Sequence, residues 1–269
     1  MVNVSLVLYN TSQDDIDRII KTCNSCKCVN KLFLIDNSNK KNKEFEKLSS
    51  ESFQYVFNSK NLGYGKAHNI AINETIKSNI AYHLVINPDI YFEPDVLESI
   101  IVFMNENPNV GQLMPKVISQ DGSIHQYCKI LPKPINLIAR SFFPKIFYKK
   151  LDDNYSMKKF KHDKIIDVPN LSGCFMFFRT VSLKDVGVFD KRFFMYAEDI
   201  DLTRRIHRKY RTIYFPNVMI IHRHERASFK NLRMKLIHVF NVVRYFNKYG
   251  WFFDSERKRI NNETLGQLN

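Results

Sequence analysis

The chain of 269 residues is poor in glycine and proline, with 8 and 9 residues respectively. Collagen-like and low-complexity chains are rich in these residue types, so both classes are excluded. Hydrophobic residues make up 44% of the chain, whereas disordered chains are poor in them. No apolar run reaches the roughly 20 residues of a transmembrane helix. These absences leave a globular fold, and the length fits one large domain or two small ones.

Basic charge is absent from residues 1–9, which form an apolar stretch. A secretory signal peptide begins with a basic region, so we expect a strand here and a cytoplasmic protein. Five cysteines, an odd number, occur in a chain large enough to fold without disulfides. Cys23, Cys26 and Cys28 cluster, but no second Cys or His pair follows at the spacing of a zinc site. We therefore expect reduced thiols with ordinary structural roles.

Positive charge is in excess, with 41 Lys and Arg against 27 Asp and Glu and a net charge of +14. Two segments hold this excess: residues 129–161 carry +7 and residues 204–259 carry +12, whereas the rest carries −5. Both are rich in large apolar residues. Basic amphipathic segments favour an anionic membrane surface over nucleic acid, because nucleic-acid binding does not account for the many Phe residues. A solvated helix face with core aromatics behind it is the alternative for the second segment.

Strand and helix patterns alternate over the first hundred residues. Buried-strand runs occupy 4–9, 31–35, 53–57 and 82–86, and helical patterns start near residue 14 and cover 66–77 and 93–105. This alternation is typical of an α/β fold with a doubly wound, mostly parallel, Rossmann-like sheet.

The alternation ends near residue 109. Strands are expected at 112–118 and 124–130, and again after the small residues Ser172 and Gly173, which suggest a close backbone approach. No linker rich in Gly, Ser or Pro divides the chain. We therefore expect a domain over 1–228, with a nucleotide-binding half (about 1–108) and an α+β acceptor half (about 109–228). A basic amphipathic helical extension is expected over 229–269.

Polar residues follow each of the first four predicted strands. They are Asn10, Asp36 with Asn37, the stretch 58–66, and Asn87 with Asp89. Each alone is more often a turn residue. In a doubly wound sheet, however, the ligand lies beyond the carboxyl ends of the strands. Four such groups at one edge predict a nucleotide site.

A loop with two glycines, residues 61–66, precedes a predicted helix. It has neither the full dinucleotide fingerprint nor the ending of a phosphate-binding loop. Free backbone N–H groups at a helix N-terminus nevertheless suit an anion, and Lys66 adds positive charge.

Two strand ends carry side chains suited to a divalent cation or a phosphate. Asn87-Pro88-Asp89 offers oxygen ligands of the kind that Mg²⁺ shares with substrate phosphates, although a helix-entry turn is the simpler interpretation. The stretch 222–226 combines His222 and His224 with two arginines, which favours an anionic ligand or a metal.

Three carboxylates, Glu198, Asp199 and Asp201, directly follow an aromatic run at 193–196. Helix capping and pairing with nearby arginines account for some of these acids, but not for their crowding against Phe, Met and Tyr. A desolvated carboxylate is a better base, which is what general-base chemistry requires.

Taken in order, these stretches resemble the inverting, nucleotide-sugar-dependent glycosyltransferases of family two, which have the GT-A fold, and in particular their rhamnosyltransferase-like branch. The matching stretches run from residue 4 to about 228 and comprise 34–38, 61–65, 87–89, 172–175 and 194–202, followed by His222 and Ser228.

The resemblance implies a role for each motif residue. Asp199 would be the general base that deprotonates the acceptor hydroxyl, with Glu198 as its rival. Asp89, with His222 or His224, would bind Mg²⁺ or Mn²⁺ at the donor diphosphate. The donor would be held by Asn10, Asp36, Asn37, Asn61, Gly63, Tyr64, Gly65, Lys66 and Asn87. Gly173, Tyr196 and Asp201 would bind the acceptor.

The resemblance also implies a reaction and a location. A sugar, rhamnose or another hexose, would pass from a nucleotide-sugar donor to a glycan acceptor, lipid-linked, in bacterial surface polysaccharide synthesis. The enzyme would lie peripherally at the inner face of the cell membrane, on an anionic surface. A sugar-phosphate nucleotidylyltransferase is a rival, but its basic Gly-rich loop is missing after the first strand. A nucleic-acid-binding protein leaves the acidic cluster unexplained and lacks a binding motif.

Overall fold

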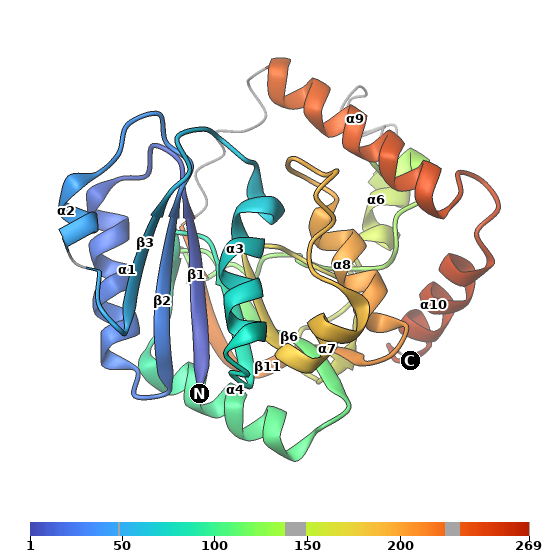
Figure 1. The fold of residues 1–269 in the computed structure, drawn as a ribbon. Coiled ribbons are helices and arrows are strands. Elements are labelled where there is room, and N and C mark those ends of the chain that lie inside the picture. The colour runs from blue at the N-terminus through green and yellow to red at the C-terminus, as the bar shows by residue number, and fades with distance from the viewer. Residues whose placement is uncertain (48, 138–148, 224–231, 269) are drawn as a thin grey trace.

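The computed structural model describes residues 1–269 except 48, 138–148, 224–231 and 269, and its centre is a nine-stranded sheet (Figure 1). The strand order is β3-β2-β1-β4-β10-β6-β11-β5, and β8 pairs with β11. The strands are β1 (Val2–Leu8), β2 (Val29–Asp36), β3 (Phe53–Phe57), β4 (Tyr82–Ile86), β5 (Ile90–Tyr91), β6 (Val110–Ile118), β8 (Ile166–Asp167), β10 (Phe175–Arg179) and β11 (Arg211–His222). A second, two-stranded sheet joins β7 (Cys128–Lys129) to β9 (Asn170–Leu171).

The direction of the strands brings their functional ends to one edge. Strands β1 to β4 are parallel, as predicted, so their carboxyl ends lie together. Strand β10 runs antiparallel to β4 and β6, and its first residue, Phe175, lies opposite Ile86 at the end of β4. Strand β11 runs parallel to β6, and Ile221 near its end pairs with Ile118. The start of β10 and the end of β11 therefore share the edge of the sheet where β1 to β4 end.

Helices cover both faces of this sheet (Figure 1). Helices α1 (Gln13–Ser25) and α4 (Pro94–Glu106) lie on one face, and α3 (Tyr64–Lys77), α7 (Thr180–Val186) and α8 (Glu198–His207) lie on the other. The other helices in the described parts of the chain are α2 (Lys43–Lys47), α6 (Lys149–Tyr155), α9 (Leu232–Tyr249) and α10 (Ser255–Gly266). The Ser12 side chain caps α1 and Pro94 occupies the first turn of α4, which are ordinary start signals for helices.

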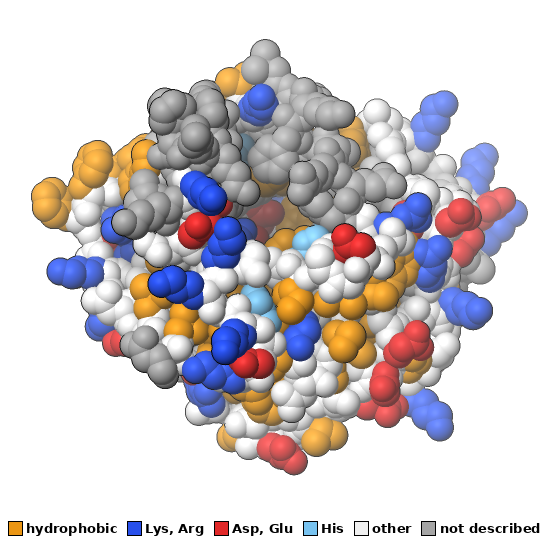
Figure 2. Space-filling view, turned by 180° about the vertical axis from the view of Figure 1, so that it is seen from behind, with side chains coloured by type: hydrophobic (Ala, Val, Ile, Leu, Met, Phe, Trp, Pro, Cys, Tyr) orange, Lys and Arg blue, Asp and Glu red, His pale blue; other side chains and the backbone are white. Residues whose placement is uncertain are grey.

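The C-terminal helices share a core with the acceptor half. Tyr245 and Phe246 of α9 pack in one buried cluster with Phe193 and with Ile200 of α8. Among the helices that the structure describes, none is both long and apolar enough to cross a bilayer. Lys and Arg side chains are spread over the face shown in Figure 2, with Asp and Glu beside several of them.

Part of the positive charge of residues 204–259 is used inside the protein. The Arg204 side chain is 1% exposed and forms ion pairs with Asp254 at 2.8 Å and Glu256 at 2.6 Å. Its guanidinium also lies 4.1 Å from the ring centre of Tyr249. These contacts fasten α8 to the α9–α10 region, so the second basic segment is in part a structural ion-pair network.

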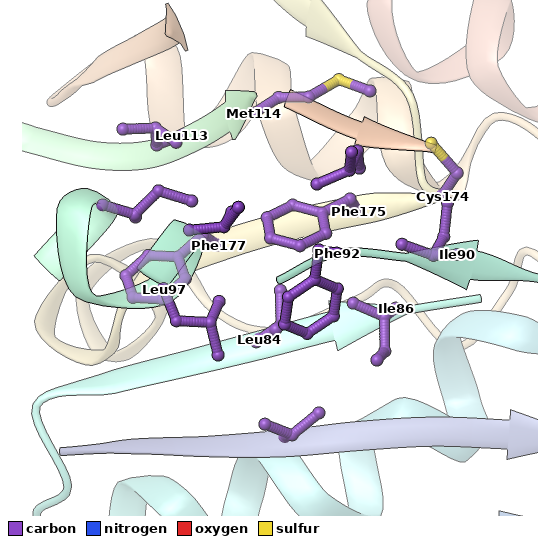
Figure 3. Close-up of a cluster of buried hydrophobic side chains, with 14 of the residues drawn as sticks. Leu84, Ile86, Ile90, Phe92, Leu97, Leu113, Met114, Cys174, Phe175 and Phe177 are labelled. Carbon is purple, nitrogen blue, oxygen red and sulfur yellow. The ribbon is translucent and has the colours of Figure 1, made fainter. Parts of the chain in front are cut away.

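Alternating residues of β10 serve the two faces of the sheet. Phe175 and Phe177 belong to a large core cluster, where the rings of Phe92 and Phe175 meet edge to face with centres 6.0 Å apart (Figure 3). Met176 and Phe178 instead pack under α3, α7 and α8. This period of two is the physical reason why a continuous apolar run forms a strand that is buried on both sides.

The strand predicted at 124–130 is wrong for most of its length. Only Cys128–Lys129 is a strand, and Ile124 makes a single bridge to Ile118. One edge of β6 is paired with β11, and the other is paired with β10 at Gln112 and Leu113. Residues after 123 meet only the end of β6, where the His125 N–H donates to the Val117 carbonyl.

Candidate active site

Asp199 lies in the first turn of α8, where the aromatic run ends. Its Oδ2 accepts a hydrogen bond from the backbone N–H of Gly173 at 3.1 Å, and its Oδ1 accepts from the N–H of Ile200 at 2.8 Å. Burial raises the pKa of Asp199, while the Ile200 N–H, the charge of Lys129 and the Gly173 N–H oppose that rise. A carboxylate in this setting is both oriented and more basic than usual, which suits a general base.

Glu198, the neighbouring acid, has a different environment. It is 5% exposed, and its Oε2 has no hydrogen-bond partner among the described residues. Burial raises its pKa well above the ordinary value, and the charge of Asp199 adds to the rise. Two adjacent buried carboxylates do not both ionise readily, and Glu198 is the more deeply buried of the two.

The turn before α8 has an unusual backbone. Tyr196 and Ala197 have φ angles of 69° and 63°, in the left-handed region that residues other than glycine seldom occupy. The Tyr196 ring packs edge-on against His238 of α9, with centres 5.3 Å apart. Such strain persists only where the surroundings enforce it, and it marks a turn that sets the direction of α8.

The glycine loop before α3 packs closely against the segment 189–194. A Cβ atom on Gly63, whose φ is +83°, would lie 2.2 Å from the carbonyl oxygen of Phe194, and one on Gly65 would lie 2.8 Å from Cβ of Phe189. The N–H of Gly63 donates to Asn61 Oδ1, and the N–H of Tyr64 donates to the Phe194 carbonyl. These two donors are therefore used inside the protein and are not available to the anion expected at this helix N-terminus.

Two of the predicted donor residues build the edge of the sheet. Asp36 accepts from the Tyr55 hydroxyl at 2.6 Å and from the Ser38 N–H at 2.8 Å. Asn37 is 1% exposed and its amide is bonded to the side chains of Asn58 and Asn61 and to the Gly63 carbonyl. In contrast, Asn10 and Lys66 are exposed. Asp36 and Asn37 are therefore held by hydrogen bonds within the protein, whereas Asn10 and Lys66 face solvent.

Asp89 and His222 form the second polar centre of this edge. His222 Nε2 lies 3.0 Å from Asp89 Oδ2, and its Nδ1 lies 2.8 Å from the Tyr127 hydroxyl. His125 stacks on Tyr127 with ring centres 4.8 Å apart. His224, the other expected metal ligand, lies outside the described residues.

Tyr127 and His125 were missed at the sequence level. The only signal for them is an aromatic residue and a histidine shortly after the strand 112–118, which is too common a pattern to single out. A partner on the far nitrogen of a ligating histidine fixes its ring orientation, so the Tyr127 hydroxyl at Nδ1 holds His222 with Nε2 toward Asp89.

A metal ion fits this pair only with help from a ligand. Within the described parts of the chain, no group of three or more His, Cys, Asp or Glu side chains converges as a metal site. Asp89 and His222 supply one oxygen and one nitrogen. Mg²⁺ and similar cations commonly take one or two protein ligands and complete their shell with substrate phosphates and water.

Cys174, at the start of β10, joins the two polar centres. Its carbonyl accepts the N–H of Asn87, two residues before Asp89, and the residue before it, Gly173, donates to Asp199. Burial raises the pKa of the Cys174 thiol to about 12, with further contributions from the charges of Asp89 and Asp199. Both carboxylates therefore flank one short stretch of chain.

Asp201 was expected to bind an acceptor, and its position contradicts this. The residue is fully buried. Its carboxylate is bonded to Arg205 at 2.9 Å, to Lys248 at 2.5 Å and to the Tyr249 hydroxyl at 2.8 Å. A carboxylate enclosed in this way fastens α8 to α9 and cannot reach a ligand.

Comparison with known proteins finds a family match and curated relatives. The chain matches the family model described as Glycosyl transferase family 2 over residues 6–187. It is 27% identical over 179 residues to the N-acetylglucosaminyl-diphospho-decaprenol L-rhamnosyltransferase of Mycobacterium tuberculosis, in two strains. The match covers 60% of this chain and 56% of the relative, so the chain spans little more than half the length of the curated relatives it matches.

Solved structures share the fold at low sequence identity. GalNAc-T7, solved with UDP, GalNAc and Mn²⁺, has a TM-score of 0.64 at 15% identity, covering 93% of this chain and 49% of its own. Staphylococcus aureus TarS 1–349 has a TM-score of 0.61 at 16% identity, covering 98% and 70%. A Pyrobaculum calidifontis mannosyltransferase, solved with GDP-Man and Mn²⁺, has 0.56 at 15% identity, covering 90% and 64%.

The family match covers more than half of the chain and includes β1 to β4 and β10, which form the edge described above. The chain therefore belongs to glycosyltransferase family 2 and has the GT-A fold.

Proposed function

We propose that the protein transfers a sugar from a nucleotide-sugar donor to a lipid-linked glycan acceptor, with inversion at the anomeric carbon and with Asp199 as the general base. The observation that carries this proposal is the setting of Asp199. Two backbone N–H groups orient its carboxylate, and burial raises its pKa, as it does for the neighbouring Glu198.

In this proposal Asp199 takes the proton of the acceptor hydroxyl while that oxygen attacks the anomeric carbon. The bond from that carbon to the diphosphate oxygen breaks in the same step. One in-line displacement inverts the configuration and needs no protein nucleophile. The Gly173 N–H fixes Oδ2, which keeps the base in position without a change of rotamer.

Asp89 and His222 would hold a divalent cation, Mg²⁺ or Mn²⁺, together with the donor diphosphate. When bound, the cation would neutralise the charge that develops on the leaving diphosphate. Asn10 and Lys66, both exposed at the same edge, would contact the nucleotide. Because Asn87 carries a neutral amide, Asp89 supplies the one carboxylate of the stretch Asn87-Pro88-Asp89.

The acceptor and the location follow from the family relationship and the charge pattern. One relative acts, by its name, on N-acetylglucosaminyl-diphospho-decaprenol. We infer a lipid-linked acceptor for this chain, a sugar such as rhamnose or another hexose, and a role in surface polysaccharide synthesis. A peripheral position on the anionic inner face of the membrane would place the enzyme beside such an acceptor. The catalytic unit would span 1–228, with 229–269 as its helical extension.

A screen of nucleotide sugars with different bases and sugars tests the donor half of this proposal. Thermal stabilisation is measured with and without Mn²⁺ for the native protein and for Asp89→Asn. The proposal predicts one preferred donor whose effect needs Mn²⁺ and is weakened in the variant. Equal stabilisation in every arm would show that Asp89 does not support a metal-dependent donor site.

A further inference from the structure

Two adjacent aromatic side chains project into solvent at the turn between α9 and α10. Phe252 is 81% exposed and Phe253 is 97% exposed, the two highest values among the exposed large hydrophobic residues of the described chain. Hydrophobic side chains project at the left edge of Figure 2, the side on which this turn lies. Exposed apolar groups of this size are unfavourable in water and mark an interaction site when they adjoin one another.

The turn that carries the pair is firmly built. Gly250 has a φ of +101°, and a Cβ atom there would lie 2.6 Å from the Phe253 carbonyl oxygen. Buried Arg257 donates to the Trp251 carbonyl at 3.2 Å. Asp254 caps α10 through the Arg257 N–H at 2.8 Å and also binds Arg204 of α8. The two rings are therefore held outward by a fixed backbone.

Basic residues outnumber acidic ones along α9, the turn and the start of α10. Residues 232–259 contain seven Lys and Arg but only two acids, Asp254 and Glu256. Both acids are paired with Arg204, and their side chains are 3% and 27% exposed. Lys235, Arg244 and Lys258 are exposed.

Helix α9 adds to the apolar surface. Leu236 is 52% exposed and Phe240 is 64% exposed, and a spacing of four residues puts both on one side of the helix. Exposed cations beside exposed Phe and Leu are the combination that binds an anionic lipid surface.

We propose that the α9–α10 turn is a membrane anchor that inserts Phe252 and Phe253 into the interface of an anionic bilayer, while the cations around it contact lipid headgroups. This inference deepens the proposed peripheral location and rests on the proposed function only in that a membrane carries the acceptor. Because Asp254 in the same turn binds Arg204 of α8, insertion would also fix how the helix with Glu198 and Asp199 is oriented toward the bilayer.

The single tryptophan of the chain, Trp251, lies next to the pair and reports on insertion. Full-length protein is titrated with vesicles of phosphatidylcholine alone and with vesicles that also contain phosphatidylglycerol. The proposal predicts a blue shift of Trp251 emission and quenching by brominated lipids, both with the anionic vesicles and both weakened by salt. Phe252→Ser with Phe253→Ser is expected to raise the lipid concentration for half-maximal binding at least about tenfold.

Val102→Ser with Val181→Ser is the matched control, since these residues are 56% and 54% exposed on α4 and α7. The control variant should bind vesicles like the native protein. Equal binding by the Phe variant, or a change from dimer to monomer with vesicle binding unaffected, overturns the inference. Donor stabilisation is measured on the same samples. Loss of vesicle binding by the Phe variant with donor stabilisation intact supports the anchor. Absence of donor stabilisation in the native protein with vesicle binding intact contradicts the proposed function and leaves the anchor standing.

Discussion

The backbone N–H of Gly173 donates a hydrogen bond to Oδ2 of Asp199 at 3.1 Å. The carbonyl of the same residue accepts the Tyr64 hydroxyl at 2.5 Å. One glycine thus joins α3, in the nucleotide-binding half, to the first turn of α8. A Cβ atom on Gly173 would lie 3.5 Å from Cβ of Asp199 and 3.6 Å from the Tyr64 ring, which shows how closely the three residues pack.

Tyr64→Phe removes the hydroxyl that holds Gly173 and leaves the ring in place. We expect kcat to fall about fivefold, as for the loss of one hydrogen bond of about 1 kcal/mol, with the donor KM unchanged. Steady-state kinetics with varied donor measure both constants. Tyr210→Phe, which loses an exposed hydroxyl bonded to Asp185, is the control. A higher donor KM with unchanged kcat would instead make Tyr64 a donor-binding residue.

Gly63→Ala and Gly173→Ala should differ sharply in stability. A Cβ on Gly63 would collide with the Phe194 carbonyl and would occupy a positive φ, whereas a Cβ on Gly173 meets ordinary contacts. We expect Gly63→Ala to cost roughly 2–4 kcal/mol of unfolding free energy, and Gly173→Ala less than about 1. Urea unfolding monitored by circular dichroism measures both. Similar costs at the two positions would contradict the close packing of the glycine loop.

Tyr127→Phe should weaken metal-dependent donor binding without touching either proposed ligand. The hydroxyl bonded to Nδ1 of His222 is lost, so the ring is no longer fixed with Nε2 toward Asp89. Loss of such a partner typically costs about 10- to 100-fold in metal affinity. Titration of Mn²⁺ in the presence of the donor measures the half-maximal concentration. An unchanged value would remove His222 from the proposed cation site.

Glu256→Gln tests the ion pairs that fasten α8 to α10. The Arg208 hydrogen bonds, and then those of Arg204, lower the pKa of Glu256 to about 2. A lowered carboxyl pKa stabilises the fold above the unfolded pKa of about 4.3, and this contribution is lost as the pH falls towards 2. We expect the variant to lose roughly 1–2 kcal/mol at pH 7, because the group is partly solvated, and almost nothing near pH 2.

Glu263→Gln is the matched control for this effect. Its partner Arg259 and Glu263 itself are 60% and 57% exposed, and exposed pairs contribute little. Urea unfolding at several pH values compares the two variants. A loss for Glu256→Gln that does not depend on pH would mean that its packing, and not its charge, matters.

The sheet and its polar edge could be predicted because strand ends are local signals. Asp36, Asn87 and Asp89 each follow an apolar run directly, and parallel pairing then places them together. The strand at 124–130 could not be judged in this way, since how far it pairs with β6 depends on where β10 and β11 lie along β6. Pairing across a sheet is a property of the whole fold.

The roles of single residues were harder to predict than their neighbourhood. Asp201 stands two residues from Asp199, and this spacing turns it about 200° around the helix axis, towards Lys248 and Tyr249. The glycines at 63 and 65 suggested an anion site, whereas contacts with residues more than 120 positions away explain them. Burial and distant partners decide such roles, and neither is visible in a short motif.

Asp199→Asn is the most direct test of the account, because the amide keeps the shape of the side chain and removes only its basicity. Glu198→Gln is compared with it in the same transfer assay, using the preferred donor and a lipid-linked acceptor. The native enzyme should become active as the pH rises through the raised pKa of Asp199, above the ordinary value of about 4. We predict that Asp199→Asn lowers kcat about 10²- to 10⁴-fold with donor binding intact. Transfer at the native rate by Asp199→Asn, or a comparable loss in Glu198→Gln alone, would contradict the assignment of Asp199 as the base.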